Sequence, residues 1–344
     1  MASVNRQTAT SLEAVTRAIE FRGPPWLPIK DYGPQSDVVD VACEPIKSGE
    51  AADDPQLDEW LCRWVRANPE LTGDQGQCVE RPLDDLAGIE DYAWPDGSDP
   101  RRTGKLRVQL EPAGEASWRD KYIRVCILHL LWERMWSLHG FADCMVDLMD
   151  DLPQMHDMAD RIVEFDMELM RNLHRSCGNR VHGIGFSDDW GTQVNLQISV
   201  ELWRSFFRPR YKKIFDLIHA CGWHVWFHSC GRINSILPDM IELGVDVVNM
   251  KQPLSNGIEE IGRDFAGKIC FETVVDVQKT LPKGDREEIA DQAKALLQHW
   301  STPAGGFILC DVADHETIGS RPETKQFVLD TFRKLDPYKK QSPA

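Results

Sequence analysis

The chain has 344 residues and a formal net charge of −16, with 55 acidic side chains against 39 basic ones. This acidic balance argues against a general affinity for nucleic acid, because the phosphate backbone is bound by a cationic protein face. There is no run of about 18 apolar residues, and the first residues, MASVNRQT, lack the apolar stretch of a signal peptide. We therefore expect neither membrane insertion nor export, and a cytoplasmic protein.

Ten cysteines are scattered along the chain without a tight framework. Several of them, such as Cys126, Cys221 and Cys270, lie inside apolar segments. This usage favours reduced thiols over structural disulfides, and a reducing cytosol leaves thiolates available for metal.

The amino-terminal third begins with an expected helix. Thr10 and Glu13 form a capping-box pattern before apolar residues at helical spacing. Two short apolar pieces follow, at residues 26–29 and 38–42, and are typical of barrel strands. Residues 43–118 are rich in Asp, Pro and Gly, and we expect a loop-rich insertion there.

From residue 121 the chain alternates brief apolar runs with amphipathic segments, which is the signature of βα units and a parallel sheet. The expected strands are 122–129, 181–186, 223–230, 245–250, 268–272 and 306–310. The expected helices are 152–174, 233–243, 258–265, 286–300 and 322–334. A further helix is expected to be capped by Ser199 and interrupted at Pro209. With the two amino-terminal pieces this gives eight strands. The pattern predicts a (β/α)8 TIM barrel over residues 1–344 as a single domain, with the insertion at 43–118 and regular βα units over 119–335.

The most informative stretch is WHVWFHSCG at residues 223–231. His228 and Cys230 are two positions apart at the end of an expected strand, so their side chains share one face. An imidazole beside a thiol makes half of a zinc site. A hydrogen-bonded structural histidine and a buried cysteine explain the same pair, and the pair alone leaves both interpretations open.

Other polar residues lie at or just after strand ends, where a barrel gathers them at one mouth: Asp188, Asp189, Asn249, Glu272 and Cys310. A thiolate from Cys310 would complete a His, Cys, Cys set with one open position, as in a catalytic zinc site. Glu272 is a possible fourth ligand, or a partner that orients a ligand.

The remaining mouth residues have looser expected roles. Asp188 or Asp189 could orient substrate or act as acid or base, although a DDWG turn can equally cap a helix or close a loop. Trp190, Gln193 and Asn249 are candidate substrate-binding residues in the pocket wall.

Three segments resemble the uroporphyrinogen decarboxylase superfamily, and most closely its corrinoid-linked methyltransferases. They are FHSCGRINSILPDMIELGVDVVN at 227–249, GFSDDWGTQ at 185–193 and VDVQKTLPKG at 275–284. The resemblance covers about residues 120–335 and implies the same barrel. It also implies zinc bound by a His-x-Cys pair, matched by His228 and Cys230, and by a later Cys. That later ligand normally comes a few residues after GGFIL, where this chain has Ala313, so Cys310 is either a displaced substitute or a packing residue.

The resemblance implies a zinc-dependent methyltransferase that moves a methyl group between a small-molecule donor or thiol acceptor and a corrinoid. Asp314, His315 and Gly319 do not have the spacing of the DxHxxG corrinoid-binding loop, so a separate corrinoid protein or free corrinoid would supply that cofactor. The alternative is a metal-free, decarboxylase-like lyase acting on a carboxylated substrate. The arginine-rich motif of the decarboxylases corresponds here to FRGPPWLPIK, with only Arg22 and Lys30, which favours the methyltransferase.

Overall fold

The buried apolar runs of the chain pair into one parallel sheet in the computed structural model, which describes residues 9–66, 68, 76–111 and 114–339. The strands of this sheet are β1 (Ile29–Lys30), β2 (Val38–Val41), β5 (Tyr122–Ile127), β6 (Gly183–Ser187), β7 (His224–His228), β8 (Val247–Asn249), β9 (Cys270–Thr273) and β10 (Phe307–Cys310). Their order is β1-β10-β9-β8-β7-β6-β5-β2, and every pairing is parallel.

The sheet curls into a nearly closed barrel. β1 and β2 form its two edges, and the edges are joined where Asp37 N–H donates to the Ile29 carbonyl at 2.7 Å. The predicted TIM barrel is therefore confirmed. The first strand begins later than expected, at Ile29, because Pro24, Pro25 and Pro28 have no N–H to donate to a neighbouring strand.

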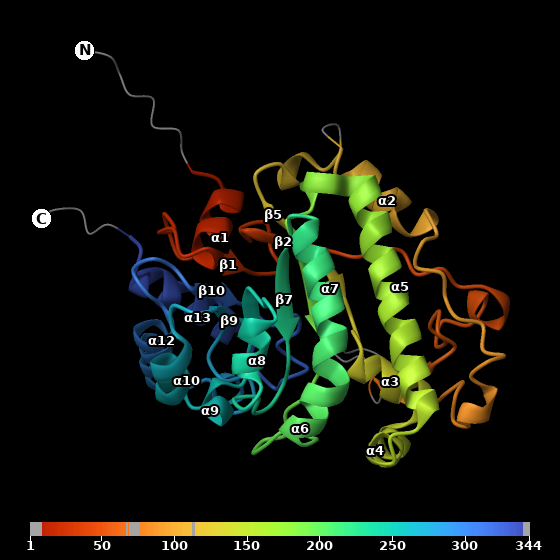
Figure 1. Cartoon of the computed structure of the whole chain (residues 1–344). Coiled ribbons are helices and arrows are strands. Elements are labelled where there is room, and N and C mark those ends of the chain that lie inside the picture. The colour runs from red at the N-terminus through yellow and green to blue at the C-terminus, as the bar shows by residue number, and fades with distance from the viewer. Residues whose placement is uncertain (1–8, 67, 69–75, 112–113, 340–344) are drawn as a thin grey trace, which may run out of the picture.

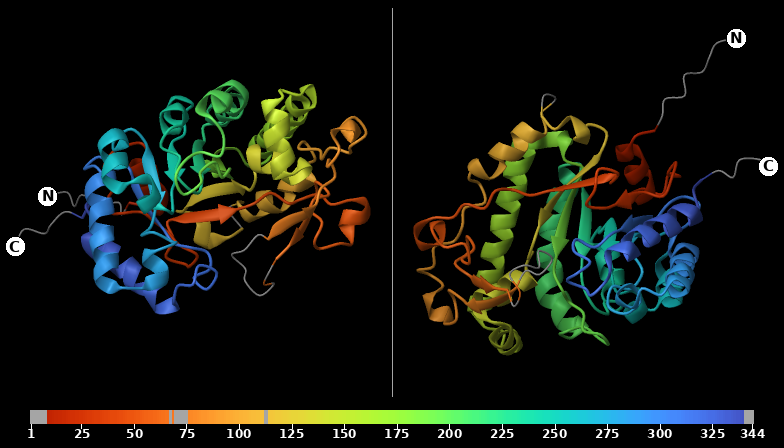
Figure 2. Two further views of the ribbon diagram at one scale, coloured as in Figure 1. Left: turned by 90° about the horizontal axis from the view of Figure 1, so that it is seen from below. Right: turned by 180° about the vertical axis from the view of Figure 1, so that it is seen from behind.

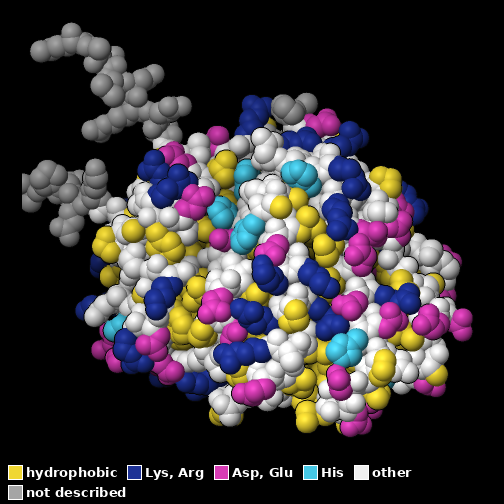
Figure 3. Space-filling view, viewed as in Figure 1, with side chains coloured by type: hydrophobic (Ala, Val, Ile, Leu, Met, Phe, Trp, Pro, Cys, Tyr) yellow, Lys and Arg dark blue, Asp and Glu magenta, His cyan; other side chains and the backbone are white. Residues whose placement is uncertain are grey.

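Helices cover the outside of the barrel (Figures 1 and 2). They are α1 (Ser11–Ile19), α2 (Arg101–Gln109), α3 (Trp132–His139), α4 (Phe141–Met149), α5 (Pro153–Cys177), α6 (Val200–Leu202), α7 (Arg208–Ala220), α8 (Leu237–Glu242), α9 (Pro253–Asn256), α10 (Ile258–Phe265), α11 (Thr280–Lys283), α12 (Arg286–Trp300) and α13 (Pro322–Leu335). The face that carries α5 and α7 shows basic and acidic side chains intermingled (Figure 3), and pairs such as Lys212–Asp216, at 2.6 Å, explain the mixture. No described helix is long and apolar enough to cross a membrane.

Two expected helix starts are confirmed. The Thr10 side chain accepts the Glu13 N–H at 3.1 Å, and Ser199 accepts the Leu202 N–H at 3.1 Å. The helix is interrupted before Pro209 and not at it, so this expectation is wrong in position. One π-helical turn at Trp203–Phe207 links α6 to α7, and Pro209 falls in the first turn of α7, where a missing N–H costs little.

The insertion lies on the side of the barrel away from α12 and α13 (Figures 1 and 2). It contains the antiparallel hairpin of β3 (Arg63–Val65) and β4 (Gln77–Glu80), short 3-10 turns at Gly49–Ala52, Leu86–Gly88 and Ala116–Trp118, and helix α2. The amino-terminal end of the barrel is closed by α1, whose Val15, Ala18 and Ile19 pack among buried barrel residues that include Tyr122 and Trp226. The opposite end, where the strands finish, is left for a functional site.

Candidate metal centre

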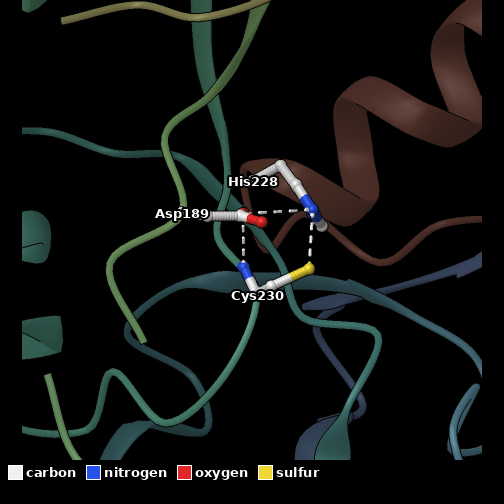
Figure 4. Close-up of side chains that lie close together, drawn as sticks. All are labelled: Asp189, His228 and Cys230. Carbon is white, nitrogen blue, oxygen red and sulfur yellow. Dashed lines mark hydrogen bonds and ion pairs between the residues drawn. The ribbon is translucent and has the colours of Figure 1, made fainter. Parts of the chain in front are cut away.

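Three potential metal ligands converge at the carboxyl end of the barrel (Figure 4). His228 is the last residue of β7, Cys230 follows two positions later, and Asp189 lies two positions beyond β6. His228 Nε2 is 3.4 Å from Cys230 Sγ and 3.6 Å from Asp189 Oδ1. The three ligand atoms all lie within 4.8 Å of one another, and this is the single such group among the described residues.

These separations fit a zinc ion. Zinc binds nitrogen, oxygen and sulfur at about 2.0 to 2.3 Å in a tetrahedron, so its ligand atoms lie about 3.3 to 3.8 Å apart. The distances of 3.4 and 3.6 Å from His228 Nε2 to Cys230 Sγ and Asp189 Oδ1 fall in that interval. Three protein ligands leave one coordination position for water or substrate, which is the arrangement of catalytic zinc sites.

The imidazole of His228 is oriented for metal by a neighbour. His228 Nδ1 is 2.5 Å from Asn249 Oδ1, while Asn249 Nδ2 donates to Glu272 Oε2 at 2.7 Å. Because a carboxylate only accepts hydrogen bonds, Glu272 fixes the amide so that its oxygen faces His228. His228 Nδ1 must then carry the proton, and the Nε2 lone pair is free to bind a metal.

Glu272 is itself held in a buried network of charges. Arg124 Nη1 donates to Glu272 Oε2 at 3.0 Å, and Arg124 Nε donates to Asp40 at 2.7 Å. Lys30 Nζ is 3.0 Å from Asp40. Since both carboxylate oxygens of Glu272 are engaged by Arg124 and Asn249, this residue orients the site and lies outside the ligand group.

The Cys230 side chain requires a cation to ionise. Burial, together with the nearby Asp189 carboxylate, raises the pKa of the Cys230 thiol well above its usual range. Asp189 Oδ1 also accepts the Cys230 N–H at 2.7 Å, which fixes the two residues relative to each other. A bound metal ion would stabilise the thiolate and offset this cost.

Glu133, in the first turn of α3, is a site residue that the sequence did not reveal. It accepts a hydrogen bond from Ser187 Oγ at 2.8 Å, and it is only 8% exposed. Burial, with Asp189 and Asp188 nearby, raises the pKa of Glu133 to about 9, so this carboxyl is protonated at neutral pH. Its one sequence signal was a lone acidic residue within the apolar stretch LHLLWERMW.

Asp188 has a structural role, which was the second of the two interpretations that the DDWG turn left open. Its carboxylate accepts the N–H groups of Leu131, Trp132 and Glu133 at 2.8 to 3.0 Å, and the Tyr211 hydroxyl at 2.6 Å. It is fully buried and caps the amino terminus of α3. The structure therefore does not bring Asp188 to the ligand group.

The predicted pocket walls are placed differently. Trp190 is fully buried, stacks on Trp132 at 5.3 Å and donates its indole N–H to Tyr211, so it belongs to the core. Gln193 is exposed and hydrogen-bonds to Gln252 and Ser255 in neighbouring loops. Asn249 does line the mouth, where it contacts His228.

Cys310 lies in the same mouth but apart from the ligand group. It ends β10, it is 1% exposed, and its thiol donates to the Asp311 carbonyl at 3.1 Å. It lines a cavity of about 250 Å³ together with His228, Asn249, Glu272, Lys30, Arg124 and Lys251. Burial and the Glu272 carboxylate raise the pKa of Cys310 to about 11. In this structure Asp189 takes the place expected for Cys310.

Comparison with known proteins identifies the lineage. Residues 134–328 match the model of the uroporphyrinogen decarboxylase (URO-D) family, which is more than half of the chain. The chain belongs to the uroporphyrinogen decarboxylase family. The predicted resemblance is thereby confirmed for the regular βα part of the barrel. No curated protein sequence matches the chain.

Among solved structures, this family member is similar to a methyltransferase from Methanosarcina mazei, with a TM-score of 0.71 and 12% identity over 95% of this chain and 99% of that one. A weaker likeness is found to the 3-keto-D-glucoside 4-epimerase YcjR from E. coli, with a TM-score of 0.39 and 11% identity over 75% of this chain and 96% of that one. At 12% identity the match to the methyltransferase establishes the shared barrel fold alone.

Proposed function

We propose that this protein is a zinc-dependent methyltransferase that moves a methyl group between a small molecule and a corrinoid. The observation that carries the proposal is the convergence of His228 Nε2, Cys230 Sγ and an Asp189 oxygen at the barrel mouth. Family membership and the similarity to a methyltransferase over nearly the full length of both chains support it.

His228, Cys230 and Asp189 would hold the ion, with Asn249 keeping His228 in the required tautomer. When bound, zinc supplies Lewis acidity, which either lowers the pKa of a thiol acceptor or activates the heteroatom of a methyl donor. The mouth cavity beside His228 is lined in part by the buried aromatic side chains Phe227 and Trp226, which would give a bound substrate apolar surroundings. Protonated Glu133 is placed to keep the surroundings of Asp189 from accumulating negative charge.

The corrinoid is part of the proposal. We infer that it arrives on a separate protein or as the free cofactor, because the chain lacks the DxHxxG spacing of a corrinoid-binding loop. A thiol bound at the mouth would accept a methyl group from the corrinoid, whereas a methyl donor bound there would give its methyl group to the corrinoid.

A metal-free lyase is the second candidate, and one observation favours it. Lys30, Arg124 and Lys251 all line the mouth cavity, and Lys251 Nζ forms no hydrogen bond or ion pair with the described residues. A spare cation in a buried mouth suits a substrate carboxylate. Arg22 does not contribute, because it is exposed and pairs with Glu20.

The test is methyl transfer with free corrinoid. We expect the zinc-loaded protein to demethylate methylcobalamin in the presence of a thiol, or to methylate reduced cobalamin from a methyl donor, as followed by the corrinoid absorption spectrum. Cys230→Ser should abolish this reaction. A lyase would instead release carbon dioxide from a carboxylated substrate at equal rates in the wild type and in Cys230→Ser.

A further inference from the structure

Three cavities meet at one residue beside the barrel mouth. Leu128, which directly follows β5 and is 61% exposed, lines the mouth cavity, a second cavity of about 250 Å³ and a third of about 770 Å³. The second and third cavities are walled by the insertion and by α3 and α5. The cavity beside His228 therefore adjoins the two cavities of the insertion at Leu128.

The second cavity contains two buried polar atoms without partners. Asp166 Oδ2 on α5 and Arg134 Nε on α3 form no hydrogen bond within the described part of the chain, although both residues line this cavity. Asp166 is 2% exposed and Arg134 is 8% exposed. Buried polar groups are nearly always hydrogen-bonded, so two orphan atoms on residues that line one cavity point to a polar group of a ligand as their partner.

The charged side chains around the second cavity pair with one another, so they do not select the charge of a ligand's polar group. Arg134 Nη1 pairs with Asp58 at 2.9 Å, and Arg102 pairs with Glu59 at 2.7 Å. Burial raises the pKa of Asp166 well above its usual range, which favours the neutral carboxyl, and a neutral carboxyl has a proton to donate. Arg134 Nε–H also donates. Both orphans therefore suit an oxygen acceptor.

The third cavity is walled by flat rings. The Trp64 and His129 rings stack with their centroids 5.0 Å apart and an interplanar angle of 22°, and Trp60 lies in the same wall. Burial and the charge of Arg134 lower the pKa of His129 to about 3, so its ring is neutral and adds to an uncharged aromatic surface. Such surfaces favour planar ligands that offer a π-face.

We propose that the insertion forms a binding chamber for a planar, ring-bearing molecule whose carbonyl or carboxylate oxygen is held between Arg134 and Asp166. The ring lies against Trp60 and Trp64, and the rest of the molecule extends past Leu128 toward His228. This inference rests on the proposed function in that it describes the substrate class of the same site. Ligand binding in the chamber does not itself require the metal.

The test uses the full-length protein freed of metal by a chelator, with benzoate and cyclohexanecarboxylate as probes that share a carboxylate and differ in their rings. Calorimetric titration should give saturable benzoate binding, with cyclohexanecarboxylate severalfold weaker. Asp166→Leu should weaken benzoate binding at least tenfold, yet raise the unfolding temperature because it removes a buried orphan group. Asp166→Asn, which keeps a donor at the same position, should bind benzoate within about threefold of the wild type.

A second pair of variants guards against a folding artefact. Trp64→Leu should weaken benzoate binding several-fold, whereas Trp118→Leu, at a half-buried tryptophan that lines none of the three cavities, should leave it unchanged. Absence of saturable benzoate binding, or equal binding by wild type, Asp166→Leu and Trp64→Leu, would overturn the chamber. Because the titration is made without metal, such a result leaves the zinc site to its own test.

Discussion

His228 Nδ1 lies 2.5 Å from the side-chain oxygen of Asn249, and this contact determines which imidazole nitrogen faces Cys230 and Asp189. The amide is fixed from behind by Glu272, which Arg124 holds in turn. A chain of buried hydrogen bonds thus reaches from Arg124 on β5, through Glu272 on β9, to the candidate zinc ligand on β7. Orientation of this kind is what a histidine in a catalytic metal site requires.

Asn249→Leu tests this relationship without replacing a metal ligand. We expect zinc affinity to fall about 10- to 100-fold, because the imidazole loses the acceptor that fixes its tautomer. Competition with a chromogenic chelator measures the change. Asn195→Leu, at an exposed loop position, is the control and should have no effect. Unchanged affinity in Asn249→Leu would show that His228 needs no orientation.

The adjacent residues Asp188 and Asp189 should respond in opposite ways to the same substitution. Asp188→Ala leaves three buried N–H groups and one hydroxyl without their acceptor, so we expect it to lower the free energy of unfolding by about 3 kcal/mol or more. Asp189→Ala should cost far less stability but lower metal content. Urea denaturation and elemental analysis of both variants give the comparison, and a metal loss confined to Asp188→Ala would reverse our assignment.

Cys310 and Cys230 form a second matched pair. Because Cys310 lies outside the ligand group, Cys310→Ser should retain zinc and lose about 1 to 3 kcal/mol of stability through the burial of a hydroxyl. Cys230→Ser should lose most of its zinc. If the two variants lose zinc equally, then Cys310 is a ligand and the mouth rearranges when metal binds.

Glu133 should make the metal-free protein sensitive to pH. The pKa of Glu133 is about 9 in the folded state against 4.5 for the ordinary carboxyl, so between these values the unfolded chain releases a proton that the folded chain retains. Stability therefore falls as pH rises through this window, by about 1 kcal/mol per pH unit. The advantage of Glu133→Gln over wild type should grow from pH 4.5 to pH 9.

Denaturation of chelated protein across that range measures the effect. Glu259→Gln, at an exposed position of α10, serves as the control and should differ from wild type by a constant amount. A Glu133→Gln difference that is also constant with pH would mean that the Glu133 carboxyl is ionised in the folded protein.

Much of the barrel was predictable because its strands are short, largely buried apolar runs bounded by turns. Because side chains alternate along a strand, the spacing of two residues also predicted that His228 and Cys230 lie on one face. Helices α3 and α4 were not predicted, because residues 130–149 combine tryptophans, methionines and acids without a clean apolar stripe. Glu133 was missed with them.

The third ligand was beyond the sequence for a geometric reason. Strand-end position alone groups Cys310 with His228, but β10 and β7 are separated by β8 and β9 around the barrel, whereas β6, which leads to Asp189, is the direct neighbour of β7. Consecutive residues in an extended segment point to opposite sides, so only one of Asp188 and Asp189 can face the mouth. The sequence does not show which of the two it is. Trp190 follows the same rule and turns into the core.

The central claim, that Asp189, His228 and Cys230 bind zinc, is tested most directly by the metal content of the zinc-supplemented protein after gel filtration. We predict close to one zinc per chain in the wild type and in Cys310→Ser, and little zinc in His228→Ala, Cys230→Ser and Asp189→Ala, with all variants folded by circular dichroism. A wild-type protein that holds no stoichiometric zinc, or one whose zinc survives all three ligand substitutions, would contradict the account.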